Sequence, residues 1–357
     1  MQQSVFEQIQ SGGHEQIVFC QDKHTGLNAI IAIHNTTLGP ALGGTRMWNY
    51  ASHQDGLTDA IRLSRGMTYK AAISGLNLGG GKAVIIGDAS KLKSETLWRR
   101  YGKFVDSLNG KYITAEDVNT NAKDMEYIGM ETKHVTGKPE YLGGSGDPSP
   151  FTAYGVYMGM KAAAKKAFGS DSLSGKKVVV QGAGNVGQYI IGYLVKDGAE
   201  ISVCDINSEK LKQTVSKFPG VQVVDGNTIF DMEMDIYAPC ALGATLTTES
   251  IAKLKAPIVA GCANNQLADE DIHGPMLKDK GIIYVPDFLI NAGGLINISV
   301  ELDGYNTDRA NSMVEKIYNR TNEIFDLCDA ENIHAQAAAM RLAEKRIHDI
   351  GLLKKVL

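Results

Sequence analysis

The segment 177–207 constrains the fold more than any other part of the chain, because four features follow one another in it. Residues 178–181 have the pattern of a buried strand, and a glycine-rich turn, a helical stretch and an acid come next. The turn consists of Gly182, Ala183, Gly184, Asn185, Val186 and Gly187. A strand, this GxGxxG turn and a helix predict a Rossmann unit whose helix N-terminus binds a pyrophosphate. The alternative is a glycine turn in a Rossmann-like domain that binds nothing.

Asp205 indicates which dinucleotide this unit would hold. It ends the next predicted strand, 200–205, where a carboxylate can accept hydrogen bonds from the ribose hydroxyls. Its charge would repel a 2′-phosphate, and no arginine stands beside it, since Ile206 and Asn207 follow. The sequence therefore favours NAD over NADP.

Strands and helices alternate through the C-terminal half. A helix is expected at 151–168, and strands at 177–181, 200–205, 221–224, 234–238, 258–261 and 282–285. This alternation predicts a doubly wound parallel sheet. The turn-forming run 143–150, GGSGDPSP, marks a domain boundary. We expect residues 143–333 to form the NAD-binding Rossmann domain, and residues 1–142, joined by a helix at 334–357, to form a second domain across a cleft.

The N-terminal half also mixes strands and helices, so the class is α/β throughout. Strands are predicted at 16–20, 27–34 and 83–86 and helices at 54–67 and 94–108, with Ser94 as an N-cap. Apolar residues occupy both alternating sets of 27–34, which predicts a strand that is buried on both faces. The tail is expected to be helical from about residue 311.

Two lysines and an acidic pair in this half suggest chemistry. Lys82 opens an apolar run after three glycines, and burial beside a strand would lower its pKa toward that of a general base. The glycines imply close approach to another backbone or to a ligand. Lys70 could lower the pKa further as a second cation, and Glu116 and Asp117 stand at a probable strand end. Taken singly, solvated lysines and a helix-capping acidic pair explain the same residues.

Composition excludes several classes of function. With 36 Lys and Arg against 40 Asp and Glu the net charge is -4, which is not the basic excess of a nucleic-acid-binding protein. No apolar run is long enough for a membrane helix, and the first residues lack the pattern of a secretory signal, so we expect a cytoplasmic protein. The five scattered cysteines form no CxxC pair, and the eight histidines show no metal-ligand spacing, so no metal is expected.

Read together, the motifs resemble the amino acid dehydrogenase superfamily of glutamate, leucine, phenylalanine and valine dehydrogenases. The resemblance covers nearly the whole chain. It rests on the GxGxxG turn and on the segments 38–46, 66–70, 79–82, 114–118, 238–241, 263–266 and 291–294. Within the superfamily the motifs look closest to the leucine-specific members, except that Gly81 is similar to the phenylalanine type.

The resemblance implies NAD-dependent, reversible oxidative deamination of a branched-chain L-amino acid, with leucine favoured, to a 2-oxo acid and ammonia. It implies that Lys82 activates water and that Asp117 moves a proton between the amino group and solvent. Lys70 would bind the substrate carboxylate, Thr152 the nicotinamide carboxamide, and Asn264 both substrate and nicotinamide. The side-chain pocket would be lined by Leu42, Ala115, Leu295 and Ile298, and Gly43 would also bind the substrate.

The resemblance also bears on specificity and assembly. Glutamate-using members have a lysine at the position of Leu42, so glutamate should be excluded. A homo-oligomer, an octamer by resemblance, is implied, with no nucleic acid or membrane partner. A phenylalanine or valine dehydrogenase is the alternative activity. A non-catalytic NAD-binding protein is the alternative of another class, and Lys70, Lys82 and Asp117 argue against it.

Overall fold

The computed structural model describes residues 4–355, which form two compact α/β units. Unit 1 comprises residues up to Gly146 together with Ile298–Thr307 and the chain from Ala343, and unit 2 comprises Asp147–Asn297 and Asp308–Leu342. The division at 146/147 falls inside the turn-forming run 143–150. Unlike the predicted domains, unit 1 also includes Ile298–Thr307, and it takes only the second part of the last helix.

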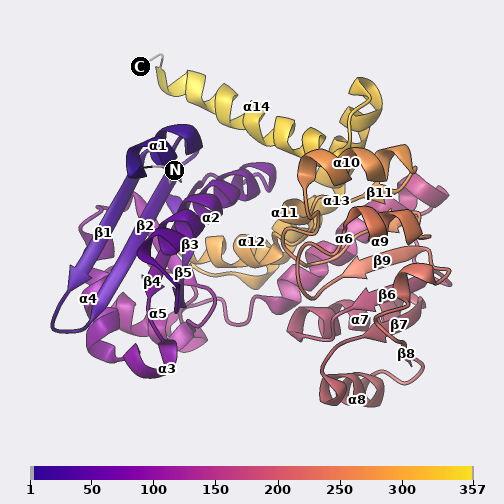
Figure 1. Ribbon diagram of the computed structural model, residues 1–357, viewed down its shortest axis with the longest axis horizontal. Coiled ribbons are helices and arrows are strands. Elements are labelled where there is room, and N and C mark those ends of the chain that lie inside the picture. The colour runs from indigo at the N-terminus through magenta and orange to yellow at the C-terminus, as the bar shows by residue number, and fades with distance from the viewer. Residues whose placement is uncertain (1–3, 356–357) are drawn as a thin grey trace. The chain divides into compact units, whose positions relative to one another are not determined.

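Unit 1 is built on a five-stranded mixed sheet in the order β1-β2-β4-β3-β5 (Figure 1). β1 pairs with β2, and β2 with β4, in antiparallel fashion, whereas β3 runs parallel to both β4 and β5. The strands are β1 Gln16–Asp22, β2 Leu27–Asn35, β3 Ala41–Trp48, β4 Gly79–Ile86 and β5 Tyr112–Glu116. The helices are α1 Val5–Gly12, α2 His53–Ile73, α3 Ala89–Leu92, α4 Glu95–Asp106, α5 Ala122–Gly129 and the 3₁₀ turn η1 Glu140–Leu142.

Helices cover both faces of this sheet, which explains the uninterrupted apolar pattern of β2. Ile30 and Ala32 belong to a core that includes residues of α2, and Ile31 and Ile33 belong to a second core with residues of α4 and α5. The predicted two-sided burial of this strand is therefore confirmed. Ser94 caps α4 as predicted, because its hydroxyl accepts the backbone N–H of Leu97.

β3 was not predicted from the sequence, because its glycines resemble a turn. They are required by close approach of neighbouring backbone: a Cβ on Gly43 would lie 1.7 Å from the carbonyl oxygen of Gly81, and one on Gly44 would lie 2.4 Å from that of Glu116. The glycines before Lys82 behave as predicted. They lie within β4 itself, and a Cβ on Gly80 would lie 2.1 Å from the backbone nitrogen of Thr68 on α2.

Unit 2 contains a six-stranded, wholly parallel sheet in the order β11-β10-β9-β6-β7-β8 (Figure 1). Its strands are β6 Lys177–Gln181, β7 Glu200–Cys204, β8 Gln222–Val223, β9 Ile236–Pro239, β10 Ile258–Val259 and β11 Ile283–Tyr284. The first strand lies in the middle and the chain winds outward in both directions, as expected for a doubly wound sheet. Ligands of such sheets bind where the strand order reverses, here at the carboxyl ends of β6 and β9.

The remaining helices complete unit 2 and the tail. They are α6 Ser149–Phe168, α7 Asn185–Asp197, α8 Ser208–Lys217, η2 Ile229–Asp231, α9 Thr248–Lys253, α10 Glu270–Asp279, α11 Asp287–Ile290, α12 Gly293–Val300, η3 Glu301–Asp303, α13 Thr307–Glu331 and α14 Ala335–Lys355. The helical tail is thus two helices, and Asn332 adopts a φ of 55° where they separate. No helix within residues 4–355 is long and apolar enough to cross a membrane.

Candidate active site

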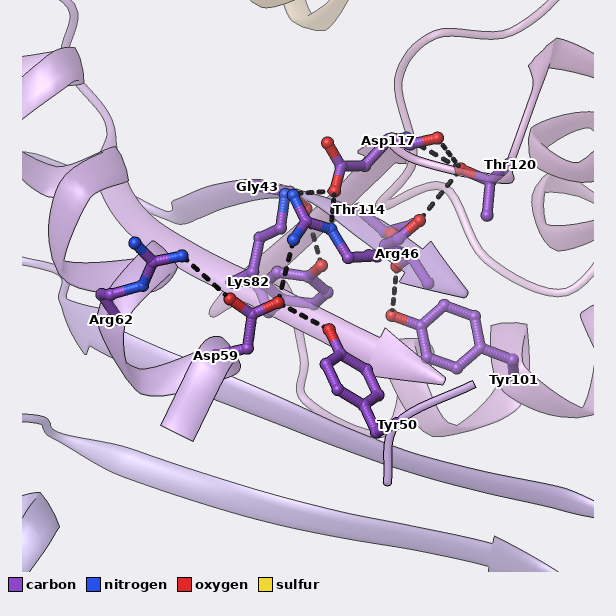
Figure 2. Close-up of polar contacts among 12 residues, drawn as sticks. Gly43, Arg46, Tyr50, Asp59, Arg62, Lys82, Tyr101, Thr114, Asp117 and Thr120 are labelled. Atoms are coloured by element: carbon purple, nitrogen blue, oxygen red, sulfur yellow. Dashed lines mark hydrogen bonds and ion pairs between the residues drawn. The ribbon is translucent and has the colours of Figure 1, made fainter. Parts of the chain in front are cut away.

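A buried ion pair forms the centre of the site in unit 1. Lys82 lies on β4, and 7% of its side chain is exposed. Its Nζ is 2.8 Å from Oδ2 of Asp117, the first residue after β5 (Figure 2). Burial lowers the pKa of Lys82, Asp117 raises it, and the Arg46 cation lowers it again, with a net downward shift. A lysine held in this way can lose its proton more readily than an exposed one.

The turn after β5 fixes the backbone of Asp117. Its N–H donates to the hydroxyl of Thr120 at 2.7 Å, and that hydroxyl in turn lies 2.9 Å from the carbonyl oxygen of Thr45 on β3. Burial alone would raise the pKa of Asp117, but Lys82 and Arg46 together hold it below its usual value. The carboxylate is therefore charged and placed by contacts from two neighbouring strands.

Arg46 is a charged residue of this site that was not singled out from the sequence. It lies on β3, and its guanidinium donates to Oδ2 of Asp117 at 3.0 Å and to Oδ2 of Asp59, on α2, at 2.9 Å. The sequence suggested Lys70 as a second cation that lowers the pKa of Lys82, and the structure shows that Arg46 lowers it. The available sequence signal for Arg46 was its place four residues after Leu42 within a glycine-rich segment.

The expected substrate-binding residues of unit 1 lie on adjoining elements. Leu42 and Ala115 are buried on β3 and β5, and the carbonyl oxygen of Gly43 accepts the hydroxyl of Tyr112 at 2.6 Å. In register, Gly44 pairs with Ala115, so the two segments are direct neighbours. Lys70 is half-buried on α2. The other two expected residues are on α12: Leu295, which belongs to unit 2, is buried, and Ile298, which belongs to unit 1, is half-buried.

The glycine turn of unit 2 joins β6 to α7 as predicted. Gly182 has a φ of 118°, which a residue with a side chain rarely adopts. A Cβ on Gly187 would lie 2.1 Å from the carbonyl oxygen of Gly182, so neither position accommodates a side chain without strain. Gly184 is the N-cap of α7, and a Cβ there would meet no atom within 4 Å. The backbone of Gly184 is therefore open to approach on the side where a Cβ would stand.

Asp205 is positioned beside the turn. Its Oδ2 accepts the backbone N–H of Ala183 at 2.7 Å and its Oδ1 accepts that of Asn207 at 2.8 Å. Asp205 and Gly182 border a cavity of about 560 Å³ at the carboxyl ends of β6 and β7. Its lining includes residues that the sequence analysis did not name: Asp225, Asn227, Leu242 and Thr245. In the sequence, these residues could have been found only because they follow strands of the parallel sheet: Asp225 and Asn227 follow β8, and Leu242 and Thr245 follow β9.

Thr152 and Asn264 also lie in unit 2. Thr152 is in the first turn of α6, and its hydroxyl donates to the carbonyl oxygen of Pro148 at 3.1 Å. Asn264 is exposed, and its Oδ1 accepts the side-chain amide of Asn291 at 2.7 Å. Asn291 also donates to the carbonyl oxygen of Cys262 at 3.1 Å, so Asn264 is oriented by a side chain that is itself held.

Family models cover both halves of the chain. Residues 14–134 match the Glu/Leu/Phe/Val dehydrogenase dimerisation domain, and residues 143–209 and 202–351 match the Glutamate/Leucine/Phenylalanine/Valine dehydrogenase model. Leucine dehydrogenase of Geobacillus stearothermophilus is 54% identical over 343 residues, covering 96% of this chain and 93% of the relative. Valine dehydrogenase of Streptomyces virginiae is 46% identical over 340 residues, covering 95% of each.

A solved structure agrees with these matches. L-tryptophan dehydrogenase from Nostoc punctiforme superposes with a TM-score of 0.85 at 45% sequence identity, covering 97% of this chain and 99% of that one. The similarity therefore includes both α/β units.

Proposed function

Because this chain belongs to the glutamate, leucine, phenylalanine and valine dehydrogenase family, we propose that it catalyses the reversible, NAD-dependent oxidative deamination of L-leucine and other branched-chain L-amino acids. The observation that carries the proposal is the Lys82–Asp117 pair, a lysine of lowered pKa against a carboxylate in a buried site. A protein that only bound NAD would have no use for it.

Each of three residues performs a different step of the proposed reaction. Lys70 binds the α-carboxylate of the amino acid and orients its Cα. Bound NAD would supply the acceptor for the hydride of Cα, the loss of which would leave the substrate as an iminium. Neutral Lys82 takes a proton from water, whose oxygen attacks the iminium carbon. Asp117 carries a proton to the departing nitrogen, so that ammonia leaves and a 2-oxo acid remains.

Unit 2 suits NAD in particular. The backbone N–H groups at the start of α7 would bind the pyrophosphate, and Asp205 would accept the ribose hydroxyls at the edge of the cavity. A 2′-phosphate at the same place would face the charge of Asp205, with Asp225 lining the same cavity. Thr152 and Asn264 would bind the nicotinamide carboxamide, and Asn264 the substrate as well.

The substrate side chain would contact Leu42, Ala115, Leu295 and Ile298. All four are apolar, so a glutamate carboxylate would lose its water without finding a cation, which costs several kcal/mol. The similarity to a valine dehydrogenase and to an L-tryptophan dehydrogenase makes valine and aromatic amino acids the alternative substrates.

We also propose a cytoplasmic homo-oligomer, an octamer by resemblance. Self-association is supported by the match of residues 14–134 to a dimerisation domain and by β1, an edge strand whose Phe19 is 59% exposed. Sedimentation equilibrium of the purified chain tests the number of subunits, and a stable monomer would contradict the proposal.

Initial rates of NADH formation test the activity. We expect leucine, isoleucine and valine to be oxidised with NAD, glutamate to be a very poor substrate, and NADP to be a poor acceptor. No amino-acid-dependent NADH formation from any of leucine, isoleucine, valine, phenylalanine and tryptophan would reject the proposal in favour of a non-catalytic NAD-binding protein.

A further inference from the structure

Arg46 links two carboxylates that come from different elements of unit 1. Its Nε donates to Oδ2 of Asp117 at 3.0 Å and its Nη1 to Oδ2 of Asp59 at 2.9 Å (Figure 2). The side chains of Arg46 and Asp59 are 23% and 14% exposed. A planar guanidinium donating along two fixed directions holds both acceptors in one geometry, which a lysine ammonium does not do.

Asp59 is itself anchored, so it can hold Arg46 in place. The hydroxyl of Tyr50 donates to the same Oδ2 at 2.6 Å, and Arg62 donates to Oδ1 at 3.2 Å. The chain of contacts runs from Tyr50, after β3, through Asp59 on α2 to Arg46 on β3. We call Arg46, Asp59 and Tyr50 the arginine clamp.

The two oxygens of Asp117 are used differently. Lys82 and Arg46 both contact Oδ2, at 2.8 and 3.0 Å. In Figure 2 the other oxygen points away from the two cations, and no group within residues 4–355 makes a hydrogen bond or ion pair with it. One oxygen is therefore fixed in place, while the other can accept or give a proton.

We propose that Arg46 is a positioning residue for the deamination reaction: held by Asp59, it fixes Oδ2 of Asp117 so that Oδ1 is presented to the substrate nitrogen. This inference rests on the proposed function, in which Asp117 carries that proton. Arg46 acts through Asp117 and does not itself exchange a proton, since a guanidinium stays charged throughout the working pH range.

The charge of Arg46 has a second effect, on the base. The charged groups that face Lys82 are Asp117 after β5, Arg46 on β3 and Asp59 on α2. Among them Arg46 is the cation, and it opposes the protonated form of Lys82. Loss of that charge raises the pKa of Lys82, so deamination, which needs the neutral amine, requires a higher pH. A purely structural arginine would have no such effect on the pH profile.

Two substitutions separate the geometry from the charge. R46K keeps the charge but loses the two-directional contact, and we expect kcat for leucine to fall about 10²-fold from misplacement of Asp117, with KM for leucine and NAD changed less than about threefold. R46Q also loses the charge, so its kcat should fall similarly and the midpoint of its rising pH profile should move to higher pH. In R46K the midpoint should stay near that of the wild type.

R100K and R100Q are the matched controls. Arg100 lies on α4 of unit 1, is 43% exposed and pairs with Asp22, and it belongs neither to the clamp nor to the contacts of Asp117. Both variants should keep the kcat and the pH midpoint of the wild type. Near-ultraviolet circular dichroism and NADH fluorescence titration show which variants are folded and bind the cofactor.

The outcomes distinguish this inference from the proposed function. A wild-type chain without amino-acid-dependent NADH formation would reject the proposed function. An active wild type whose folded R46K and R46Q variants keep its kcat and pH midpoint would reject the role of Arg46. If neither variant folds, Y50F decides the matter, because it removes only a hydroxyl that contacts Asp59: a severalfold lower kcat with unchanged KM supports the clamp, and an unchanged kcat overturns it.

Discussion

The candidate sites of the two units consist of different kinds of chemical group. The site of unit 2 is made of backbone, a glycine turn with the open N-terminus of α7, and one carboxylate that accepts two backbone N–H groups. The site of unit 1 is made of charged side chains from β3, β4, α2 and the turn after β5. A backbone site depends on local geometry, whereas a buried charge network depends on every partner, because an unpaired buried charge is costly.

The largest effect that tests this contrast is expected at Lys82. Lys82→Ala should lower kcat by about 10²–10⁴-fold, the usual contribution of a general base, while affinity for NADH stays unchanged because that site is built in unit 2. Asp117 keeps Arg46 as a partner, so the variant should fold. Stopped-flow rates and NADH fluorescence titration measure the two quantities.

Lys103→Ala is the matched control for this substitution. Lys103 is 61% exposed and lies on α4, 3.7 Å from Glu131. It should leave both kcat and NADH affinity unchanged. A Lys82→Ala variant that retains a tenth or more of the wild-type kcat would show that another group activates the water.

The next largest effect is expected from low pH on the stability of unit 1. His34 is buried, contacts the hydroxyl of Thr68 at 2.7 Å and the carbonyl oxygen of Gly12 at 3.1 Å, and packs edge-on against His14. Burial, with the neighbouring His14, lowers the pKa of His34 to about 4. The unfolded chain therefore binds a proton first, near its ordinary pKa of about 6.5, and stability falls as the pH drops from there toward 4.

The expected loss over that interval is roughly 3 kcal/mol, from about 1.36 kcal/mol per pKa unit. Both tryptophans, Trp48 and Trp98, lie in unit 1, so their fluorescence reports its thermal unfolding. His34→Asn should flatten the decline of Tm between pH 6.5 and 4, and the exposed His53→Asn should not. Equal pH dependence in all three proteins would show that His34 is not the group responsible.

The same contrast explains how much the sequence predicted. The place of the turn 182–187 between β6 and α7 was predicted correctly, and β6 has the predicted bounds, because a contiguous motif specifies local backbone structure. Lys82 and Asp117 were named through their segments and through the resemblance. Arg46 and Asp59 were not, since their pairing exists only once α2 packs against the sheet.

β3 was missed for a related reason. Gly43 and Gly44 follow Pro40 and would end most strands, but here the backbones of Gly81 and Glu116 leave no room for a Cβ. Strand propensity describes fit to a pleated, half-buried surface, and β3 lies between two strands in tight contact. Its neighbours, and not its own residues, make it a strand.

A smaller effect than those at Lys82 and His34 is expected on the preference for NAD over NADP, which we assign to Asp205 in unit 2. Asp205→Ser removes the charge that a 2′-phosphate would meet, and the ratio of kcat/KM for NAD over NADP should fall by about tenfold or more, since close charge pairs near a protein surface interact by about 1–4 kcal/mol. Asp225→Asn, on the same cavity but not in contact with the turn, should change the ratio less. Equal use of NAD and NADP by the wild-type chain would contradict the assignment to Asp205.

The smallest effect is expected in the choice between amino acid side chains. Neither the glycine turn of unit 2 nor the ion pair of unit 1 would distinguish leucine from valine. Valine lacks one methylene of leucine, and the lost apolar contact of about 0.8 kcal/mol corresponds to roughly fourfold in kcat/KM. Leucine over valine by about this factor would fit a pocket lined by Leu42, Ala115, Leu295 and Ile298. Changing both Leu295 and Ile298 to Ala should shift the preference toward phenylalanine, because the two α12 side chains that we propose to line the pocket would become shorter. The double variant is informative only if its Tm shows that it is folded, since Leu295 is buried and its loss also removes core contacts. A folded double variant with the wild-type ratio of leucine to phenylalanine would show that these residues are ordinary helix core, and that the pocket ends elsewhere.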